Sequence, residues 1–267
     1  MESSLNNQTW STVLNQTDLM TQLQTLGLKA GDVVEVHASL KSIGLVLGGA
    51  STLLEALLDV LGYEGTLVMS AQSWGNSEPA YFQHPPIALN QYKKLRETHP
   101  PFKGKFEDLK GMGSLAQAMQ TRPNVYVSAH PQAAFMAIGK QAKWITQSHP
   151  LHDAFGMTSP LGKLRELKAK VLLIGVEYDR CTGMHLGETL SAKRPVIIQG
   201  SRILEAAQAK WVKFLSLAYD SDDFISVGKH MESDHLVSMG HLGLAQTKFF
   251  ELEDATLRTQ KIFEATL

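Results

Sequence analysis

The stretch between residues 33 and 69 restricts the possible fold of this chain more than any other. Residues 33–37 are a mostly apolar run, and a loop with three glycines follows at residues 38–50. Residues 52–61 begin with Thr-Leu-Leu-Glu, a capping-box pattern that opens a helix, and residues 66–69 are a second apolar run. A strand, a loop, a helix and another strand in this order build a parallel sheet covered by helices. The stretch therefore predicts an α/β fold.

The rest of the chain continues this alternation of helical and strand patterns. Thr17-Asp18 is the expected cap of a first helix. Residues 203–217 are ambiguous, because residues 203–209 favour a helix by propensity whereas residues 210–214 alternate like a strand. We expect further helices at residues 17–26, 114–121, 159–168 and 251–263 and from residue 222, and further strands at residues 125–127, 171–176 and 195–198.

Residues 73–110 break this regular pattern. The segment contains five prolines and several aromatic residues and shows no sustained periodicity, so long regular elements are not expected in it. Long irregular insertions in compact domains usually serve function or are disordered. The aromatic residues favour order, and we predict that this insertion covers the substrate side of the protein.

Composition supports one large domain. The chain has 267 residues, of which 43% are hydrophobic, and no linker divides it. We therefore expect a single α/β domain over residues 1–267, with a central, mostly parallel sheet flanked by helices and a flexible segment at residues 1–16. The formal net charge is −1, which gives no indication of a nucleic-acid partner. Monomer and homodimer both remain open.

The expected location is the cytoplasm. Cys181 is the single cysteine, so an internal disulfide is impossible and a reducing compartment fits. The N-terminal residues show neither a basic segment nor an apolar core, so a secretory signal is not indicated. No apolar run approaches the ~20 residues that span a bilayer, and a membrane partner is not expected.

The run from Cys181 to Glu188 indicates a chemistry of proton removal. It follows the apolar strand at residues 171–176, and Thr182, His185 and Glu188 are spaced three apart, so on a helix they share one face. A histidine beside a carboxylate at the end of a buried strand is suited to act as a general base with its orienting group. These three residues are our candidate catalytic residues.

Other uses of the same run stay open. His185 could be a structural histidine beside a solvent-facing Glu188, or the two could be ligands of a metal-dependent hydrolase. A His-x-x-Glu pair supplies only two ligands and the chain lacks His-Glu-x-x-His, so no metal is expected. The thiol of Cys181 could be an acyl-accepting nucleophile, although a small buried residue is the commoner role of a lone cysteine.

Two loops add candidate binding groups. Residues 38–50 combine glycines with Lys41, a combination that can hold a phosphate, but they match neither the P-loop nor the dinucleotide pattern. A plain connection is the alternative interpretation. Ser128-Ala129-His130-Pro131 follows the expected strand at 125–127 and would lie at the same sheet edge if the strands are parallel. His130 could face a ligand there or belong to a surface turn.

Taken in order, several blocks of the chain resemble the aminoglycoside 3-N-acetyltransferase family. The resemblance extends from about residue 17 to the C-terminal helix. It rests on residues 36–44, 48–50, 65–69, 78–82, 111–113, 128–131, 159–161 and 173–176, followed by Thr182, His185 and Glu188. Members of that family transfer acetyl from acetyl-coenzyme A to an amine of an aminoglycoside. The resemblance implies this activity, a single α/β domain, and catalysis by His185 with Glu188.

The resemblance also implies the two substrate subsites. The expected coenzyme A site comprises His37, Ala38, Ser39, Leu40, Lys41, Ser42, Ile43, Gly44, Val46 and Ser128. For the amine acceptor we expect Glu78, Tyr81, Asp153, Glu177 and Asp179. Backbone amides of residues 39–44 or the Thr182 hydroxyl would stabilise the oxyanion.

The chain departs from the family pattern at several polar positions. Ala38, Val127, Ala134 and Cys181 stand where the family has polar side chains, and charged residues replace a neutral segment at 107–110. These departures affect the expected activity on aminoglycoside antibiotics more than the expected binding of coenzyme A. We therefore keep a second interpretation beside the acetyltransferase: a coenzyme A-binding member with another amine acceptor or without transfer activity.

Overall fold

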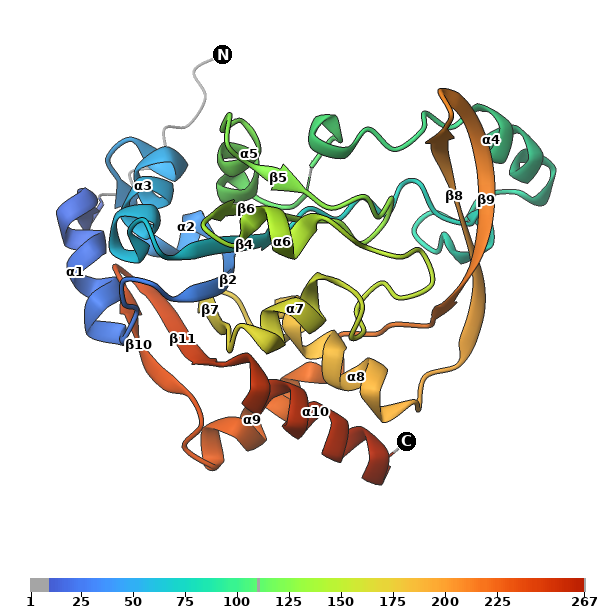
Figure 1. The fold of residues 1–267 in the computed structure, drawn as a ribbon. Coiled ribbons are helices and arrows are strands. Elements are labelled where there is room, and N and C mark those ends of the chain that lie inside the picture. The colour runs from blue at the N-terminus through green and yellow to red at the C-terminus, as the bar shows by residue number, and fades with distance from the viewer. Residues whose placement is uncertain (1–9, 110, 267) are drawn as a thin grey trace, which may run out of the picture.

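A seven-stranded sheet runs through the centre of the molecule, and helices cover both its faces (Figure 1). The computed structural model of the chain describes residues 10–109 and 111–266. In spatial order the strands are β10 (Ser238–Leu242), β11 (Ala245–Glu251), β7 (Lys170–Ile174), β2 (Val33–Ala38), β4 (Thr66–Ser70), β6 (Phe135–Gly139) and β5 (Tyr126–Val127). This confirms the predicted α/β domain with a central sheet flanked by helices.

Parallel strands form the centre of the sheet. β2 pairs in parallel with both β7 and β4, whereas β11 and β6 join this core in antiparallel orientation. The carboxyl ends of β7, β2 and β4 therefore lie at one edge, where α/β proteins bind ligands. Because β5 is antiparallel to β6, it runs in the direction of β4 and also ends at this edge.

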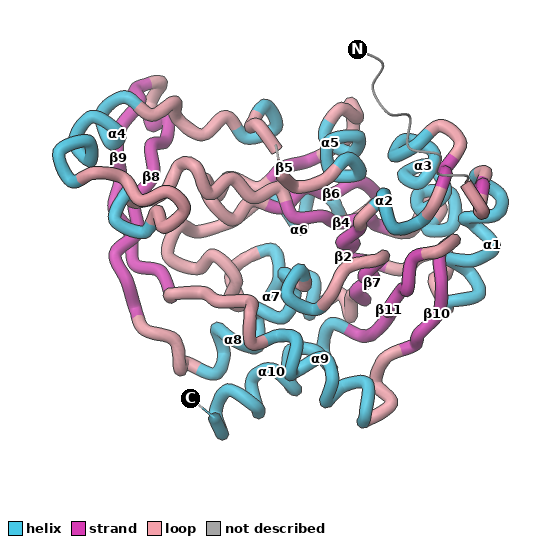
Figure 2. Tube along the Cα trace, turned by 180° about the vertical axis from the view of Figure 1, so that it is seen from behind, coloured by secondary structure: helices cyan, strands magenta, loops and turns pink. Residues whose placement is uncertain are grey.

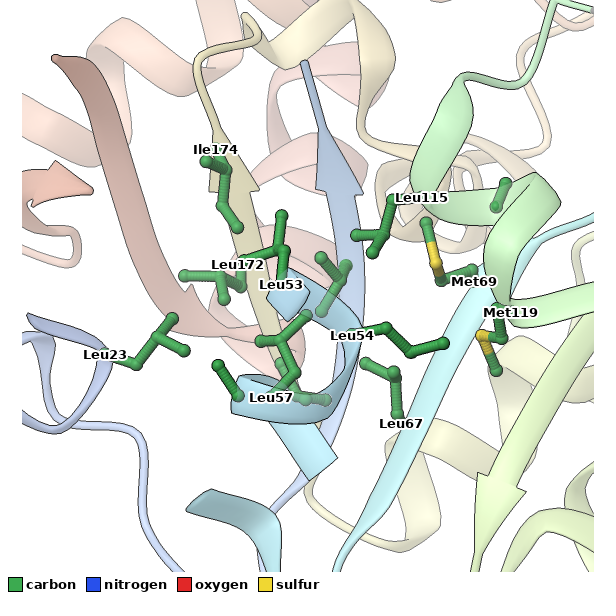
Figure 3. Close-up of a cluster of buried hydrophobic side chains, with 14 of the residues drawn as sticks. Leu23, Leu53, Leu54, Leu57, Leu67, Met69, Leu115, Met119, Leu172 and Ile174 are labelled. Atoms are coloured by element: carbon green, nitrogen blue, oxygen red, sulfur yellow. The ribbon is translucent and has the colours of Figure 1, made fainter. Parts of the chain in front are cut away.

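Three helices cover one face of the sheet. They are α1 (Gln16–Leu26), α3 (Gly49–Leu61) and α5 (Ser114–Gln120). Figure 3 shows the core beneath α3, where Leu53, Leu54 and Leu57 lie over Leu67 and Leu172 of the strands. Apolar side chains recur every three or four residues on α3 and every second residue on the strands, so the two surfaces match.

The opposite face carries the C-terminal helices, which Figure 2 shows from behind. It is covered by α6 (Ala142–Thr146), α7 (Pro160–Glu166), α8 (His185–Ser191), α9 (Phe224–Ser233) and α10 (Leu252–Thr266). Val33, Val68 and Val171 point into this second core. Side chains alternate along a strand, so Glu35 and His37 of β2 share the face of Val33.

A long hairpin stands apart from the central sheet. β8 (Val196–Glu205) and β9 (Gln208–Leu217) pair only with each other, and Figure 1 shows them beside α4 (Tyr92–Thr98). The alternative that residues 203–209 form a helix is wrong. Ala206 and Ala207 both have positive φ, 48° and 64°, as a two-residue hairpin loop requires, and the cross-strand pairing outweighs local helix propensity.

The insertion at residues 73–110 contains α4 and short 3₁₀ turns, as its composition predicts. The turns are η1 (Pro79–Tyr81), η2 (Leu89–Gln91) and η3 (Gly104–Phe106). Asn76 attaches the insertion to the hairpin: its amide donates to Arg202 O at 2.8 Å and accepts from Arg202 N at 2.7 Å. Position 110 lies outside the described residues.

Two helices begin before their expected positions. Asn15 caps α1 in a reciprocal capping box with Asp18, so the cap expected at Thr17-Asp18 is wrong by two residues. α3 begins at Gly49, which places Thr52 inside the helix and not at its cap. Because Ser, Thr, Asn and Asp all cap helices, composition alone does not choose among neighbours.

Several short elements were not expected from the sequence. β6 was missed altogether. The loop after β2 contains α2 (Leu40–Ile43) and β3 (Leu45–Val46), and β3 pairs with β1 (Val13–Leu14). This pairing attaches part of the segment expected to be flexible, residues 1–16, to the fold, while residues 1–9 lie outside the described residues. Within residues 10–109 and 111–266 we find no helix with the length and hydrophobicity that a membrane span requires.

Candidate active site

A cleft of about 680 Å³ opens at the carboxyl edge of the parallel strands. His37 and Ala38 of β2, Ser70 of β4 and the segment after β7 all contribute to its wall. That segment consists of two 3₁₀ turns, η4 (Tyr178–Arg180) and η5 (Thr182–Met184), which lead directly into α8. The order of strands thus brings residues more than a hundred positions apart into one cavity.

His185 is the first residue of α8, and its side chain lines the cleft. The imidazole stacks on Phe155, with ring centroids 4.6 Å apart and planes inclined by 17°. Tyr219 and Phe224 contact the ring edge-on. Aromatic contacts from three directions hold the imidazole in one orientation.

Glu188 lies one turn after His185 on α8 and is fully buried. Its Oε2 pairs with Nδ1 of His185. Its Oε1 accepts hydrogen bonds from Arg194 Nε at 2.6 Å and from the Asp220 amide at 3.1 Å. Both carboxylate oxygens are thus engaged by the protein, and Nε2 is the nitrogen of His185 that a ligand in the cleft can reach.

Arg194 compensates the buried charge of Glu188. Its guanidinium also donates to Asp223 Oδ2 at 2.7 Å and lies over the ring of Phe263 at 5.0 Å. Burial on its own would lower the pKa of Arg194. The hydrogen bonds to Glu188 and Asp223 outweigh burial and raise this pKa, so the guanidinium stays charged. The His185–Glu188 pair is therefore part of a satisfied polar network.

Thr182 lines the cleft one turn before His185. Its hydroxyl oxygen accepts from Ser70 Oγ at 2.8 Å and from Gln72 Nε2 at 3.4 Å. Both contacts use the oxygen as acceptor, which leaves the hydroxyl proton for a ligand. Thr182 can therefore donate a hydrogen bond into the cleft from a position beside His185.

The expected coenzyme A residues divide into two groups. His37, Ala38, Ser39, Leu40 and Lys41 line the cleft. The remaining five are not among its lining residues: Ser42, Ile43, Gly44, Val46 and Ser128.

The residues outside the cleft have structural contacts instead. Ile43 and Val46 are buried in the core. Gly44 has φ of +105° and faces Thr12 O. Ser128 directly follows β5 at the expected edge, but its hydroxyl contacts Nδ1 of His149 at 2.9 Å and accepts from Phe135 N at 2.9 Å.

Of the five expected acceptor residues, only Asp179 lines the cleft, and it pairs with Arg180 at 3.2 Å. Glu78 is bound by Arg96, and Glu177 by Lys248 at 3.0 Å. Of these three carboxylates, only that of Asp179 belongs to the cleft wall.

The other two expected acceptor residues also lie outside the cleft lining. Asp153 accepts the backbone N–H of Thr158 at 2.8 Å. Tyr81 is exposed. Neither residue contributes to the cavity that contains His185.

Cys181 lines the cleft beside Thr182, yet its side chain is almost wholly buried. Burial, and secondarily the carboxylate of Glu35, raises the pKa of the thiol well above its usual range. A thiol that resists ionisation is a poor nucleophile, so this environment favours a packing role for Cys181.

His130 does not line the cleft and is not at the surface. It is buried, and its Nδ1 accepts the backbone N–H groups of Gln132 and Ala133 at 3.2 and 3.0 Å. Its ring lies 4.7 Å from that of His149. Burial lowers the pKa of His130 to about 4, so it is neutral near pH 7. Its Nε2 lies 3.3 Å from Leu151 O, in the loop that carries Phe155.

Several cleft residues were not identified from the sequence. Gln72 and Trp74 follow β4, Met112 and Gly113 precede α5, Ser114 begins it, and Tyr219 follows the hairpin. Burial raises the pKa of Tyr219 to about 12, so its hydroxyl stays protonated beside Thr189. The position of Gln72 just beyond a buried strand is a signal that could have identified it, whereas nothing in the sequence marks Tyr219. Among the described residues, no group of three or more His, Cys, Asp and Glu side chains is arranged to hold a metal.

The fold and this cleft agree with one known class of enzyme. The profile of the aminoglycoside 3-N-acetyltransferase family matches residues 36–264. The chain belongs to this family and is an acyltransferase.

Individual relatives extend over most of the chain. The SPbeta prophage-derived aminoglycoside N(3')-acetyltransferase-like protein YokD of Bacillus subtilis is 36% identical over 242 residues, which cover 90% of this chain and 89% of YokD. The crystal structure of YokD superposes with a TM-score of 0.93 and 33% identity, covering 96% of each chain. Aminoglycoside N(3)-acetyltransferase III of Pseudomonas aeruginosa is 32% identical, covering 89% of each chain.

A solved structure named AAC-IIIb binary with CoASH is also similar. Its TM-score is 0.85 and its identity 25%, and the match covers 95% of this chain and 97% of that one. That relative therefore has the same fold and was solved with coenzyme A.

Proposed function

We propose that this protein transfers acetyl from acetyl-coenzyme A to an amine of an aminoglycoside-like acceptor. His185 is the general base and Glu188 its orienting partner. The observation that carries this proposal is the cleft-lining imidazole whose Nδ1 pairs with a buried carboxylate. Family membership supports the acyl transfer, and the coenzyme A complex of a relative supports the acyl donor.

The pairing supports a defined division of roles. Glu188 at Nδ1 fixes the tautomer and leaves Nε2 to take the proton from the amine, as general base catalysis requires. Once the imidazolium forms, the buried carboxylate stabilises it. Arg194 pairs with the other oxygen of Glu188 and compensates the buried charge from the far side.

The amine attacks the thioester carbonyl as it loses its proton, and the carbonyl oxygen becomes negative. A hydrogen-bond donor aimed at that oxygen would lower the barrier. The Thr182 hydroxyl is suited to this role, because Ser70 and Gln72 donate to its oxygen and leave its proton free. Collapse of the intermediate then breaks the carbon–sulfur bond and releases the thiol.

Lys41 supports placing the acyl donor along the start of the loop after β2. It is exposed on the cleft wall, where its charge can meet a phosphate of coenzyme A. The residues that fit this substrate are His37 to Lys41. The cytoplasmic location and the monomeric or homodimeric state stay predictions.

The direct test is thiol release from acetyl-coenzyme A in the presence of a panel of aminoglycosides and simple polyamines, with metal analysis of the same preparation. We expect thiol release that depends on an aminoglycoside and persists after chelation. Tight coenzyme A binding without turnover on any amine would support the coenzyme A-binding interpretation instead. Near-stoichiometric zinc, with activity lost on chelation, would support the hydrolase.

A further inference from the structure

The imidazole of His37 is held in the cleft wall with its proton on a defined nitrogen. His37 is the last residue but one of β2 and lines the cleft, and its side chain is only 10% exposed. The backbone N–H of Thr182 donates to its Nε2 at 3.3 Å. A backbone N–H can only donate, so Nε2 carries no proton in this arrangement. The neutral ring therefore has its proton on Nδ1.

Glu35, two residues earlier on the same face of β2, does not alter this assignment. Its Oε1 lies 3.1 Å from Nε2 of His37. Neither of its oxygens, however, has a hydrogen-bond partner within residues 10–109 and 111–266. The hydrogen bond that orients the imidazole is thus the one from Thr182.

Gly183 permits this hydrogen bond. A Cβ built on Gly183 would lie 2.6 Å from Oε2 of Glu35 and 2.7 Å from a methyl carbon of Leu252. The turn η5 can therefore pack this closely against β2 only because residue 183 has no side chain. The contact between Thr182 and His37 follows from this packing.

Two uncharged donors consequently face the cleft beside the proposed base. The imidazole of His37 makes one hydrogen bond in the described part of the chain, at Nε2, and its Nδ1–H is left to a molecule in the cleft. The hydroxyl proton of Thr182 is free as well, because Ser70 and Gln72 both donate to its oxygen. An N–H in a largely buried wall needs an acceptor, which a bound ligand can supply.

The position of the two donors indicates which ligand atom they meet. His185 begins α8 directly after η5, which contains Thr182. The amine that His185 deprotonates must attack a thioester carbonyl close by, so that carbonyl is the part of the acyl donor nearest to Thr182 and His37. Uncharged donors fixed in a buried wall suit an oxygen that becomes negative only during the reaction. The phosphates of coenzyme A are better matched by the exposed Lys41.

We infer that Nδ1–H of His37 is, with the Thr182 hydroxyl, a donor to the thioester carbonyl oxygen, so that the two residues form an oxyanion hole. This inference rests on the proposed acetyl transfer. The nitrogen–carbon bond forms as His185 takes the amine proton, and the carbonyl electron pair moves to the oxygen, where both hydrogen bonds strengthen. When the carbonyl re-forms, the carbon–sulfur bond breaks with its electron pair on sulfur. The thiolate takes a proton from solvent as His185 returns one, and His37 neither gains nor loses a proton.

The test compares three replacements of His37. Asparagine has an amide N–H on Cγ, where histidine has Nδ1, whereas leucine has no donor there. Neither side chain reaches the place of Nε2, so both variants lose the contact with Thr182 equally. We expect His37→Leu to lose about 10²-fold in kcat, the scale of one lost oxyanion donor, and His37→Asn less than about tenfold. In calorimetry both should bind acetyl-coenzyme A within a factor of about three of the wild type.

An altered acyl donor tests the same hydrogen bond from the ligand side. In acetyl-dithio-coenzyme A a sulfur replaces the carbonyl oxygen, and sulfur is a weak hydrogen-bond acceptor. The loss caused by His37→Leu should therefore shrink from about 10²-fold with acetyl-coenzyme A to less than about tenfold with the dithioester. A loss of the same size with both donors would overturn the inference.

The controls separate this role from folding and from the proposed function. His241→Asn, at an exposed position on β10 outside the cleft lining, should match the wild type. If His37→Leu does not fold, His37→Gln replaces it, because its amide reaches toward the place of Nε2 and leaves no donor at that of Nδ1. Equal kcat values for His37→Asn and the variant without a donor would overturn the inference and leave acetyl transfer intact.

The pH profile of kcat gives a further readout. His37→Asn should keep the limb that reports a titrating histidine, since the proton acceptor is His185 and not His37. A folded His37→Asn variant without this limb would overturn the inference, because His37 would then be the group that takes the proton. A wild-type protein without turnover on any amine would remove the proposed function, and this inference with it.

Discussion

The ring of Phe155 lies against the imidazole of His185, with centroids 4.6 Å apart and planes inclined by 17°. Phe155 comes from the loop after α6, and His149 holds that loop by contacting Ala154 O at 2.8 Å through Nε2. The orientation of the proposed base therefore depends on a loop that precedes it by thirty residues, as well as on Glu188.

This stacking predicts that Phe155→Leu lowers turnover more than binding. Leucine fills most of the space but provides no flat surface, so His185 gains freedom and the reacting geometry loosens. We expect a loss in kcat of about tenfold or more with little change in the affinity for acetyl-coenzyme A, measured by steady-state kinetics and calorimetry. Phe250→Leu is the matched control, since Phe250 is buried on the same face of the sheet but outside the cleft lining. Equal effects of the two variants on kcat would contradict the positioning role.

We expect the replacement of Arg194 to lower the free energy of unfolding strongly. Arg194→Met would leave the fully buried Glu188 without its cationic partner, which costs about 3–5 kcal/mol when a buried pair is broken. Arg165→Met removes a half-exposed pair with Glu253, for which about 0–1 kcal/mol is expected. Urea unfolding of both variants at neutral pH compares the two losses. Similar losses would show that Glu188 does not depend on Arg194.

The buried histidine pair predicts a loss of stability in acid. Burial lowers the pKa of His130 to about 4 and that of His149 well below its ordinary value of 6.5. The unfolded chain therefore binds more protons than the folded one, so this stability is complete above pH 6.5 and is lost as the pH falls toward 4. For His130 alone the loss amounts to about 3 kcal/mol.

Urea unfolding between pH 7.5 and 4.5 measures this loss, and His130→Asn provides the comparison. Asparagine has no titrating imidazole, so the variant should be less stable at neutral pH but show a weaker dependence on pH below about 6.5. His152→Gln, at an exposed position three residues after His149, should keep the wild-type dependence. An unchanged slope for His130→Asn would contradict the assignment of the acid loss to His130.

We expect Lys41 to make a salt-dependent contribution to the binding of acetyl-coenzyme A. Because Lys41 is exposed, Lys41→Ala should weaken acetyl-coenzyme A binding by only about 1 kcal/mol, roughly fivefold. The variant should also bind with less sensitivity to salt, since a screened charge interaction has been removed. Lys29→Ala, an exposed lysine before β2 at the far end of that strand, is the control. Identical binding by Lys41→Ala and the wild type across salt concentrations would remove Lys41 from the site.

The elements that the sequence predicted have strong local signals. The unit from β2 through α3 to β4 shows apolar residues at the correct period over its whole length, and the cores on both faces confirm it. The spacing of His185 and Glu188 likewise fixes their contact, because residues three apart on a helix are neighbours. Local periodicity is sufficient for both.

What the sequence did not predict depends on contacts between distant residues. Arg194 and Phe155 reach the His185–Glu188 pair from other elements, and no local pattern marks them. The hairpin was ambiguous because residues 203–209 are good helix formers, and their cross-strand partners decide their state. The ion pairs of the acidic acceptor candidates depend on distant residues in the same way, because the sequence does not reveal the cationic partners of Glu78 and Glu177.

The most direct measurement of the central claim is turnover by His185→Gln at neutral pH. We expect a loss of about 10² or more in kcat, the usual scale for removing a general base, while the affinity for acetyl-coenzyme A in calorimetry stays within a factor of about two. Glutamine preserves much of the side-chain volume, so the aromatic contacts around position 185 should persist and the fold can be verified by its melting temperature. A folded variant that keeps more than half of the wild-type turnover would contradict His185 as the base.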